Sequence, residues 1–292
     1  MPGIYRTPDA AFEDLPGFPW EPEYLDWDGI RLARIDEGEG DPVVLFHGEP
    51  TWSYLYRKVM PPLLEAGHRC IAPDLVGFGR SDKPVELGWY SYDRHTEAMA
   101  ALLNGIGVEG ATFVVQDWGG PIGMRIAAEH PETCARLVVM DTGLFTGHQP
   151  MTDAWKAFRD FVERTEDLPI EMLIGGACHT PPGEEILAAY AAPFPEAGAK
   201  AGARAFPLML PTSPDAPGAA AGQRTLEAMA AGDWPALMLW AEHDPIIPPS
   251  VGRAMAERVG WPEPEIIPAA SHFLQEDQGE MIGERIAAWL RS

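Results

Sequence analysis

A short stretch near the middle of the chain, residues 113–121, constrains the fold more than any other. It begins with an apolar, β-branched run that is typical of a buried strand. Gly119 and Gly120 follow, and such a pair permits a turn that larger residues do not allow. Residues 122–130 then have the pattern of a helix. The stretch therefore predicts a strand, a sharp turn and a helix, with Asp117 at the turn.

This arrangement is typical of the nucleophile elbow of α/β-hydrolases, whose central residue projects from the top of the sheet. In this chain the central residue is Asp117 rather than a serine. A carboxylate is already ionised near neutral pH and can displace a leaving group from a saturated carbon, which gives an ester that water can hydrolyse. A serine alkylated at the same carbon would become an ether, which is a dead end. The sequence thus predicts displacement followed by ester hydrolysis; the alternative is that Asp117 only caps the following helix.

Two later residues complete a triad in the order nucleophile, acid and base. Asp244 follows a predicted buried strand in a loop bounded by prolines, and His272 follows the last predicted strand. Because each residue comes after a strand, we expect Asp117, Asp244 and His272 to meet at one edge of the sheet. Asp141, which follows the strand after the elbow, is the alternative acid. We favour Asp244 because Asp141 adjoins a flexible segment.

A second loop is expected to face the nucleophile. The predicted strand 42–46 ends at residues 47–52, which begin with histidine and glycine. A tight turn at this point would direct a backbone N–H toward the reacting group, as an oxyanion hole requires. The alternative is an ordinary connection between a strand and a helix.

Strands and helices alternate along most of the chain, which predicts an α/β fold of the α/β-hydrolase type, with a mostly parallel sheet and helices on both faces. The pattern changes in residues 146–224, where helical segments and many Pro and Gly residues replace strong β-runs. We expect this segment to be a helical cap, inserted after a core strand, over the active-site end of the sheet. Residues 1–145 and 225–292 would then form the core.

The cap contains aromatic side chains that could form its apolar underside, and we expect most of them to pack and the remainder to line a pocket. They are Trp155, Phe158, Phe161, Tyr190, Phe194 and Phe206.

The charge and the cysteines limit the partners and the compartment. The formal net charge is −23, which disfavours nucleic acid and anionic membranes as partners. The first residues lack a secretory pattern, and no apolar run reaches the roughly 18 residues that span a bilayer. The three cysteines show neither a disulfide framework nor a metal spacing. We expect a cytoplasmic protein with no metal and no cofactor; the oligomeric state stays open.

Three segments together resemble the haloalkane dehalogenases, and in particular the subfamily with a late aspartate as the acid. They are residues 47–58, residues 114–120 and residues 190–195. The resemblance extends over nearly the whole chain and is weakest from about residue 146 to residue 179. It implies that the substrate is a small apolar alkyl halide, which is hydrolysed to an alcohol, a halide ion and a proton.

The resemblance also implies roles for individual residues. Asp117 would displace the halide, and His272, held by Asp244, would activate the water that attacks the ester. The backbone N–H groups of Glu49 and Trp118 would form the oxyanion hole. The indole N–H of Trp118 would bind the departing halide, since a donor directed at developing charge in a water-poor pocket contributes several kcal/mol.

The chain departs from the family in one respect. Close members carry a second halide-binding tryptophan in the cap, but Ala177 or Cys178 occupies about that place in this sequence, and Trp155 is the only tryptophan of the insertion. Either Trp155 reaches the site from another helix, or one indole and a weaker partner hold the halide.

Three other functions are compatible with parts of this pattern. An epoxide hydrolase has the same triad but needs a pair of cap tyrosines, and the insertion has only Tyr190. A haloacid dehalogenase needs an arginine beside the elbow, whereas the nearest, Arg125, lies on the following helix. A non-catalytic receptor on the same fold is the remaining alternative, although the triad positions are all present.

Overall fold

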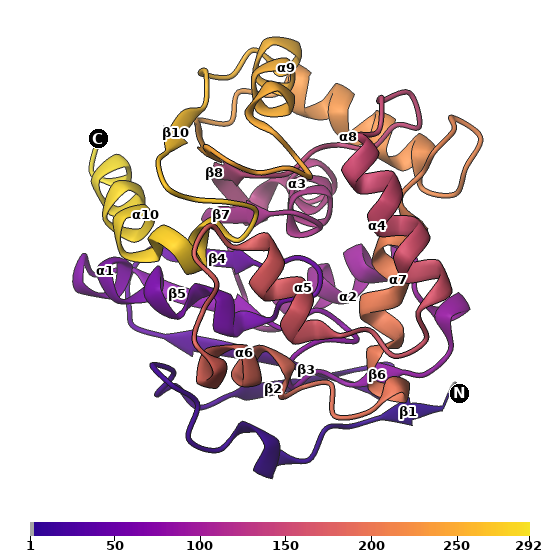
Figure 1. The fold of residues 1–292 in the computed structure, drawn as a ribbon. Helices are drawn as coiled ribbons and strands as arrows, with labels where there is room; N and C mark the ends of the chain where they lie inside the picture. The colour runs from indigo at the N-terminus through magenta and orange to yellow at the C-terminus, as the bar shows by residue number, and fades with distance from the viewer. Residues whose placement is uncertain (1–2) are drawn as a thin grey trace.

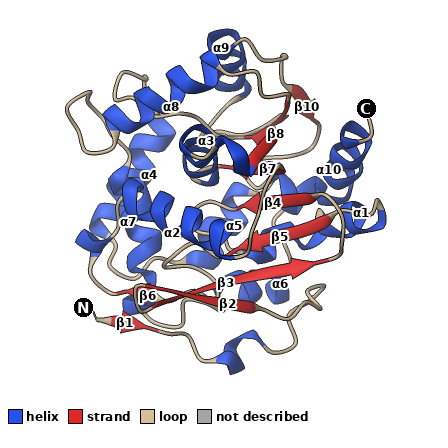
Figure 2. Ribbon diagram, turned by 180° about the vertical axis from the view of Figure 1, so that it is seen from behind, coloured by secondary structure: helices blue, strands red, loops and turns tan. Residues whose placement is uncertain are grey.

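A computed structural model describes residues 3–292, and its centre is a sheet of eight strands (Figures 1 and 2). The strand order is β10-β9-β8-β7-β4-β5-β3-β2. The strands from β10 to β5 are parallel to their neighbours, whereas β3 is antiparallel to β5 and β2 is antiparallel to β3. The prediction of a mostly parallel sheet is therefore confirmed. A small second sheet pairs β1 with β6, which the sequence did not indicate.

The strands of the main sheet are short and largely buried. They are β2 (Glu23–Trp27), β3 (Ile30–Glu37), β4 (Pro42–Phe46), β5 (Arg69–Pro73), β7 (Ala111–Gln116), β8 (Cys134–Met140), β9 (Ala236–Ala241) and β10 (Glu265–Ile267). The second sheet consists of β1 (Ile4–Tyr5) and β6 (Lys83–Pro84).

The helices fall into a core set and a set from the inserted segment. The core helices are α1 (Met60–Glu65), α2 (Tyr92–Gly105), α3 (Gly119–Glu129), α8 (Ala219–Ala231), α9 (Pro249–Val259) and α10 (Leu274–Leu290). The inserted helices are α4 (Asp153–Arg164), α5 (Ile170–Ala177), α6 (Glu184–Ala191) and α7 (Ala201–Met209). Short 3₁₀ turns are η1 (Asp9–Phe12), η2 (Ser53–Lys58), η3 (Leu87–Trp89), η4 (Pro131–Thr133) and η5 (Ala197–Lys200).

Two groups of core helices cover the opposite faces of the sheet (Figures 1 and 2). On one face α1 packs against α10, and these helices also contact β5 and β9. On the other face α2 packs against α3, α3 against α8, and α8 against α9. The apolar strands between them, such as β7 and β9, are buried along their whole length. This confirms helices on both faces.

One helix boundary differs from that expected. The helix of the elbow begins at Gly119, directly after the turn, and not at residue 122. The closing helix begins at Leu274 and includes non-helical backbone at Gln278. Between β4 and β5 the chain forms two short helices, η2 followed by α1. Two prolines in the first turn of α1 favour a fresh helix start there, because a proline at that position sacrifices no hydrogen bond.

The inserted helices form two packed pairs, α4 with α7 at the right of the view in Figure 1 and α5 with α6 nearer its middle. The expected boundary at residue 224 falls inside α8, which packs against the core helices α3 and α9. We therefore propose that the cap ends before Ala219, where Gly218 turns the chain with a φ of 85°. Gly218 serves here because this backbone region favours glycine.

A buried ionic cluster joins the cap to the core. Arg57 of η2 donates two hydrogen bonds to Glu276 of α10, at 2.6 and 2.8 Å, and Tyr190 of α6 donates its hydroxyl proton to the same carboxylate at 2.7 Å. Lys58 Nζ also contacts this carboxylate, at 2.8 Å from Glu276 Oε1. Burial raises the pKa of the Glu276 carboxyl, but Arg57, Lys58 and Tyr190 outweigh it and hold this pKa below its usual value.

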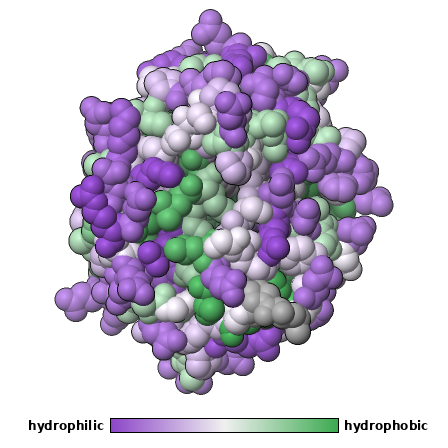
Figure 3. Space-filling model, turned by 90° about the vertical axis from the view of Figure 1, so that its right-hand side faces the viewer, coloured by the Kyte–Doolittle hydropathy of each residue, from purple (hydrophilic) through white to green (hydrophobic). Residues whose placement is uncertain are grey.

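The face that turns toward the viewer in Figure 3 is covered mostly by hydrophilic residues, with a narrower strip of apolar residues across its middle. Within residues 3–292, no helix combines the length and the apolarity that crossing a membrane requires.

Candidate active site

Asp117 stands at the turn between β7 and α3 with a φ of 48°. A non-glycine residue in this region is strained by about 1 kcal/mol or more, so its surroundings must hold it there. Its N–H donates to the carbonyl of Asp141 at 3.1 Å, and its own carbonyl accepts from Gly120 N–H at 3.0 Å and from the Thr142 hydroxyl at 2.5 Å. These bonds fix the backbone on both sides of the side chain.

The turn also depends on small neighbours, as the sequence predicted. A Cβ atom on Gly120 would lie 1.9 Å from the Thr142 hydroxyl oxygen, and one on Gly48 would lie 2.2 Å from the Asp117 carboxylate. Both contacts are far below van der Waals distance, so a larger residue at either position would displace the elbow or the loop that faces it.

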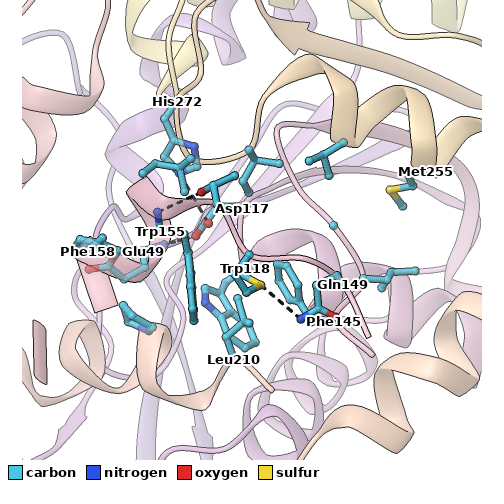
Figure 4. A pocket seen from close by; sticks show the side chains of 18 of the residues that line it. Glu49, Asp117, Trp118, Phe145, Gln149, Trp155, Phe158, Leu210, Met255 and His272 are labelled. Atoms are coloured by element: carbon cyan, nitrogen blue, oxygen red, sulfur yellow. Dashed lines mark hydrogen bonds and ion pairs between the residues drawn. The ribbon is translucent and has the colours of Figure 1, made fainter. Parts of the chain in front are cut away.

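The structure brings the three residues of the predicted triad together, and Figure 4 shows two of them, Asp117 and His272. His272 Nδ1 lies 2.7 Å from Asp244 Oδ2, and His272 Nε2 lies 3.7 Å from Asp117 Oδ2. The other oxygen of Asp244 accepts from the N–H groups of Ile246 and Ile247 at 2.7 and 3.0 Å. Since a carboxylate accepts, His272 donates through Nδ1 and presents Nε2 to Asp117.

The charges of the triad support one another. Burial alone would lower the pKa of His272, but the carboxylates of Asp244 and Asp117 outweigh it and raise this pKa well above the usual value. Burial would raise the pKa of Asp244, but His272 and the two backbone donors hold it below its usual value. These directions favour an imidazolium at His272, between Asp244 and Asp117, before any substrate reacts.

Asp141, the alternative acid, lies close to this pair but in another role. Ligand atoms of Asp141, Asp244 and His272 lie within 4.8 Å of one another. Asp141 Oδ1 accepts from Ala241 N–H at 2.9 Å, while Oδ2 is buried without a partner among the described residues. Burial, together with the Asp244 charge, raises the pKa of Asp141 well above its usual value. The direct hydrogen bond to the histidine thus belongs to Asp244, and the raised pKa of Asp141 favours its neutral form.

The loop after β4 faces the elbow as expected. Glu49 N–H donates to Asp117 Oδ1 at 2.8 Å. His47 holds the loop: its Nε2 accepts from Leu75 N–H at 2.9 Å, and its Nδ1 lies 2.9 Å from the Gly48 carbonyl. Burial lowers the pKa of His47, in keeping with a neutral ring. Trp118 lies directly before α3, where a helix leaves its first N–H groups without acceptors.

Two polar side chains contribute to the site in ways that the sequence did not predict, namely those of Gln116 and Glu49. Gln116 donates through Nε2 to the His272 carbonyl at 3.0 Å, which ties the base to the elbow strand. The Glu49 carboxyl is buried beside Asp117, and burial followed by the Asp117 charge raises its pKa well above the usual value. The available signal for Gln116 was a lone polar residue within a buried apolar strand; for Glu49 none was available beyond its position after His47 and Gly48.

The triad opens onto a cavity of about 690 Å³ between core and cap. Trp118, Phe145, Trp155, Phe158 and Leu210 line it beside the catalytic end (Figure 4). Of the aromatics expected beneath the cap, Trp155 and Phe158 face this cavity, Phe161 is exposed, and the other three are buried in packing. Three of the six cap aromatics therefore pack away from the cavity, which is half of them and not the majority that was expected.

The structure shows where Ala177, Cys178 and Trp155, the residues considered for the second halide-binding position, lie relative to the cavity. Ala177 lines the cavity and Cys178 is buried outside its lining, so neither supplies an indole. Trp155 of α4 lines the same cavity as Trp118 and lies near it in Figure 4. Within residues 3–292, neither indole nitrogen has a hydrogen-bond partner. Trp155 therefore reaches the site from a different helix.

The residues considered for the competing functions are engaged elsewhere. Tyr190 is fully buried, donates to Glu276 and does not line the cavity. Arg125 pairs with Asp93 at 2.6 Å and with Glu129 at 2.7 Å. Neither side chain is available to a substrate beside Asp117.

Comparisons with known proteins agree with this geometry. Residues 41–169 match the family model described as alpha/beta hydrolase fold. A haloalkane dehalogenase from Mycobacterium marinum is 42% identical over 302 residues, which cover 98% of this chain and 99% of that protein. Haloalkane dehalogenase 1 of Mycobacterium tuberculosis H37Rv is 43% identical over 301 residues, or 98% of each chain.

A solved structure gives the same result. The tetrameric haloalkane dehalogenase DpaA from Paraglaciecola agarilytica superposes with a TM-score of 0.90 at 34% identity and 97% coverage of both chains. The chain described here belongs to the haloalkane dehalogenase family. The resemblance noted in the sequence is thereby confirmed, and with it a hydrolase that acts on carbon–halide bonds.

The neutral state of Asp141 leads to a prediction about pH. Its pKa is raised on folding from an ordinary value of 3.8, so the folded protein holds this proton more tightly than the unfolded chain. The stabilisation of the folded protein by protonated Asp141 is therefore complete at low pH and is lost as the pH rises toward the raised pKa of this group. Asp141→Asn retains the shape without titrating, so we expect the variant to gain stability over the parent as the pH is raised from about 4 to about 7.

The measurement is the free energy of unfolding in urea at each pH. Asp153→Asn, an exposed carboxylate on α4, is the matched control and should show no such trend. A difference between parent and Asp141→Asn that stays constant with pH would contradict a neutral Asp141.

Proposed function

We propose that this chain hydrolyses haloalkanes to an alcohol, a halide ion and a proton through an alkyl ester on Asp117. The observation that carries the proposal is the placement of this carboxylate. Asp117 lies at the end of a largely apolar cavity, with Glu49 N–H on one oxygen and His272 at 3.7 Å from the other.

In the first step Asp117 attacks the carbon that bears the halogen. Because Oδ1 is held by Glu49 N–H, the oxygen free to react is Oδ2. A bond forms between this oxygen and the carbon while the carbon–halogen bond breaks, and its electron pair leaves with the halide. The indole N–H groups of Trp118 and Trp155 bind that ion, since both side chains line the cavity and neither indole has another partner among residues 3–292. A donor directed at developing charge contributes several kcal/mol in such a site.

In the second step water attacks the ester carbonyl carbon of Asp117, and His272 Nε2 accepts its proton. The backbone N–H groups of Glu49 and Trp118 stabilise the oxyanion. The alcohol then departs, the carboxylate is restored, and His272 releases the proton that it took up.

Alkylation itself prepares His272 to act as the base. The Asp117 charge is one of the causes that raise the pKa of His272 in the free enzyme. An ester carries no charge, so formation of the intermediate removes this stabilisation of the imidazolium. The pKa of His272 falls at the moment when a neutral imidazole is required, and Asp244 then stabilises the proton that arrives.

An epoxide hydrolase on the same triad is not favoured. Such an enzyme must donate protons to the epoxide oxygen, and among the described residues no tyrosine lines the cavity. A reducing, cytoplasmic setting also belongs to the proposal; its support is that Cys70, Cys134 and Cys178 are buried free thiols.

A His272→Gln variant tests the two-step scheme. With 1-bromobutane we expect about one bromide per enzyme and then arrest, because the ester forms but no base activates water. Intact-mass spectrometry should show the added butyl group, and peptide mapping should place it on Asp117. Steady-state turnover should fall by about 10³-fold or more.

Asp117→Asn is the matched control and should show neither bromide release nor a mass increase. Sustained turnover by His272→Gln, or a butyl adduct at another residue, would contradict the scheme. Bromide release by neither the parent nor the variant would contradict the proposed function.

A further prediction concerns the indole of Trp155, which lines the cavity from α4. If Trp155 binds the departing halide, Trp155→Phe should raise the dissociation constant for bromide by about tenfold, the effect of losing one hydrogen bond to a charged group. Saturable quenching of tryptophan fluorescence by bromide measures this constant.

Trp289→Phe, on α10 and outside the cavity, controls for the loss of one fluorophore. An unchanged constant in Trp155→Phe would leave Trp118 as the sole indole donor.

A further inference from the structure

The cavity extends well beyond the triad along one face of α9. Ser250, Val251, Ala254, Met255 and Arg258 line it, which is the spacing of one side of a helix. At 1.5 Å per residue, the distance from Ser250 to Arg258 is about 12 Å. Figure 4 shows Met255 well away from Asp117, and Arg258 follows one turn further along the helix.

This extent indicates a substrate larger than a two-carbon halide. A volume of about 690 Å³ lies in the range of pockets that enclose drug-sized molecules. The wall between the triad and the outer end is mostly apolar, with side chains such as Ile247, Val251 and Met255. A long alkyl chain fits this wall, since it would bury apolar surface along its whole length.

The charges that line the cavity are unevenly distributed. The chain has 44 acidic side chains against 21 Lys and Arg. Even so, among residues 3–292 the only acidic side chains in the lining are Glu49 and Asp117, both at the catalytic end. Arg258 lines the outer part, and within residues 3–292 it forms no ion pair or side-chain hydrogen bond. The outer end thus presents a guanidinium with no anion opposite it.

The arginine nearest the elbow provides a contrast. Arg125 is neutralised by Asp93 and Glu129, so among residues 3–292 no unpaired arginine or lysine lies beside Asp117 to hold a carboxylate next to the reacting carbon. A short haloacid would place its charge next to Asp117 and Glu49. A carboxylate at the far end of a long chain would instead meet Arg258, whose planar fork matches the two oxygens of such a group.

We propose that Arg258 binds the anionic end of a long substrate whose other end carries the halogen, such as an ω-haloalkanoate, while the halogen-bearing carbon lies against Asp117. The proposal rests on the proposed function and specifies its substrate class. The ordered features are the reactive carboxylate at one end, the apolar wall of α9 between, and the guanidinium at the other end.

The test compares 8-bromooctanoate with 1-bromooctane in the parent, Arg258→Gln and Arg258→Glu, by bromide release. We expect Arg258→Gln to raise the ratio of the KM of the carboxylate to that of the bromoalkane by about two- to fivefold, the range for a solvent-accessible ion pair. Arg258→Glu should raise the ratio further and should favour (8-bromooctyl)trimethylammonium. 3-Bromopropanoate is too short to span the cavity, and its KM should not follow the charge at position 258.

Arg253→Gln is the matched control, because Arg253 is an exposed arginine of the same helix that does not line the cavity. It should leave the ratio unchanged. A ratio that is the same in the parent and in both Arg258 variants, or one that Arg253→Gln changes equally, would overturn the subsite. Absence of bromide release by the parent from 1-bromooctane and 1-bromobutane alike would instead contradict the proposed function.

Discussion

The whole site depends on the Asp117 side chain being held in one position while one of its oxygens stays free. Three parts of the chain contribute to this. Thr142 and Gly120 bond the Asp117 carbonyl, Glu49 N–H bonds one carboxylate oxygen, and His272 faces the other at 3.7 Å. The strained φ of 48° persists because these contacts leave no alternative. A fixed nucleophile needs little reorganisation before it attacks, which is how position contributes to rate.

The electrostatics follow from the same placement. Four carboxyl groups, Asp117, Asp141, Asp244 and Glu49, lie near one imidazole, and burial would make four negative charges very costly. The raised pKa values of Glu49 and Asp141 remove two of these charges. The remaining two stand on opposite sides of His272, one bonded to Nδ1 and one facing Nε2. In the proposed mechanism, esterification of Asp117 removes one of these negative charges, and this couples the first step to the second.

Much of this arrangement could be predicted from the sequence because parallel strands bring their ends together. The apolar runs before Asp117, Asp244 and His272 are readable, and residues that follow such runs share one edge of the sheet. The sequence distinguishes Asp244 from Asp141 poorly. Both residues follow neighbouring strands, β9 and β8, and only their side-chain contacts show which one bonds His272.

The orientation of the cap helices could not be predicted from the sequence, for a physical reason. Its helices have no sheet to fix which face turns inward, so the inward orientation of Trp155 and the exposure of Phe161 on the same helix depend on tertiary packing. The proposed earlier end of the cap has a similar cause: α8 has the composition of the preceding Ala-rich segment and yet packs on the core. Contacts between distant residues leave little local pattern: the polar Gln116 in a buried apolar strand is visible in the sequence, but its partner, the His272 carbonyl, is not.

One measurement tests the central claim directly, namely that Asp117 is the nucleophile. The parent enzyme, in excess over 1-bromobutane, is allowed a single turnover in water enriched in ¹⁸O, and the peptide that contains Asp117 is then analysed by mass spectrometry. The account predicts that one heavy oxygen enters the Asp117 carboxylate, because water attacks the ester carbonyl. Bromide release with the label in the alcohol and none in Asp117 would show that water attacks the substrate directly, and would contradict it.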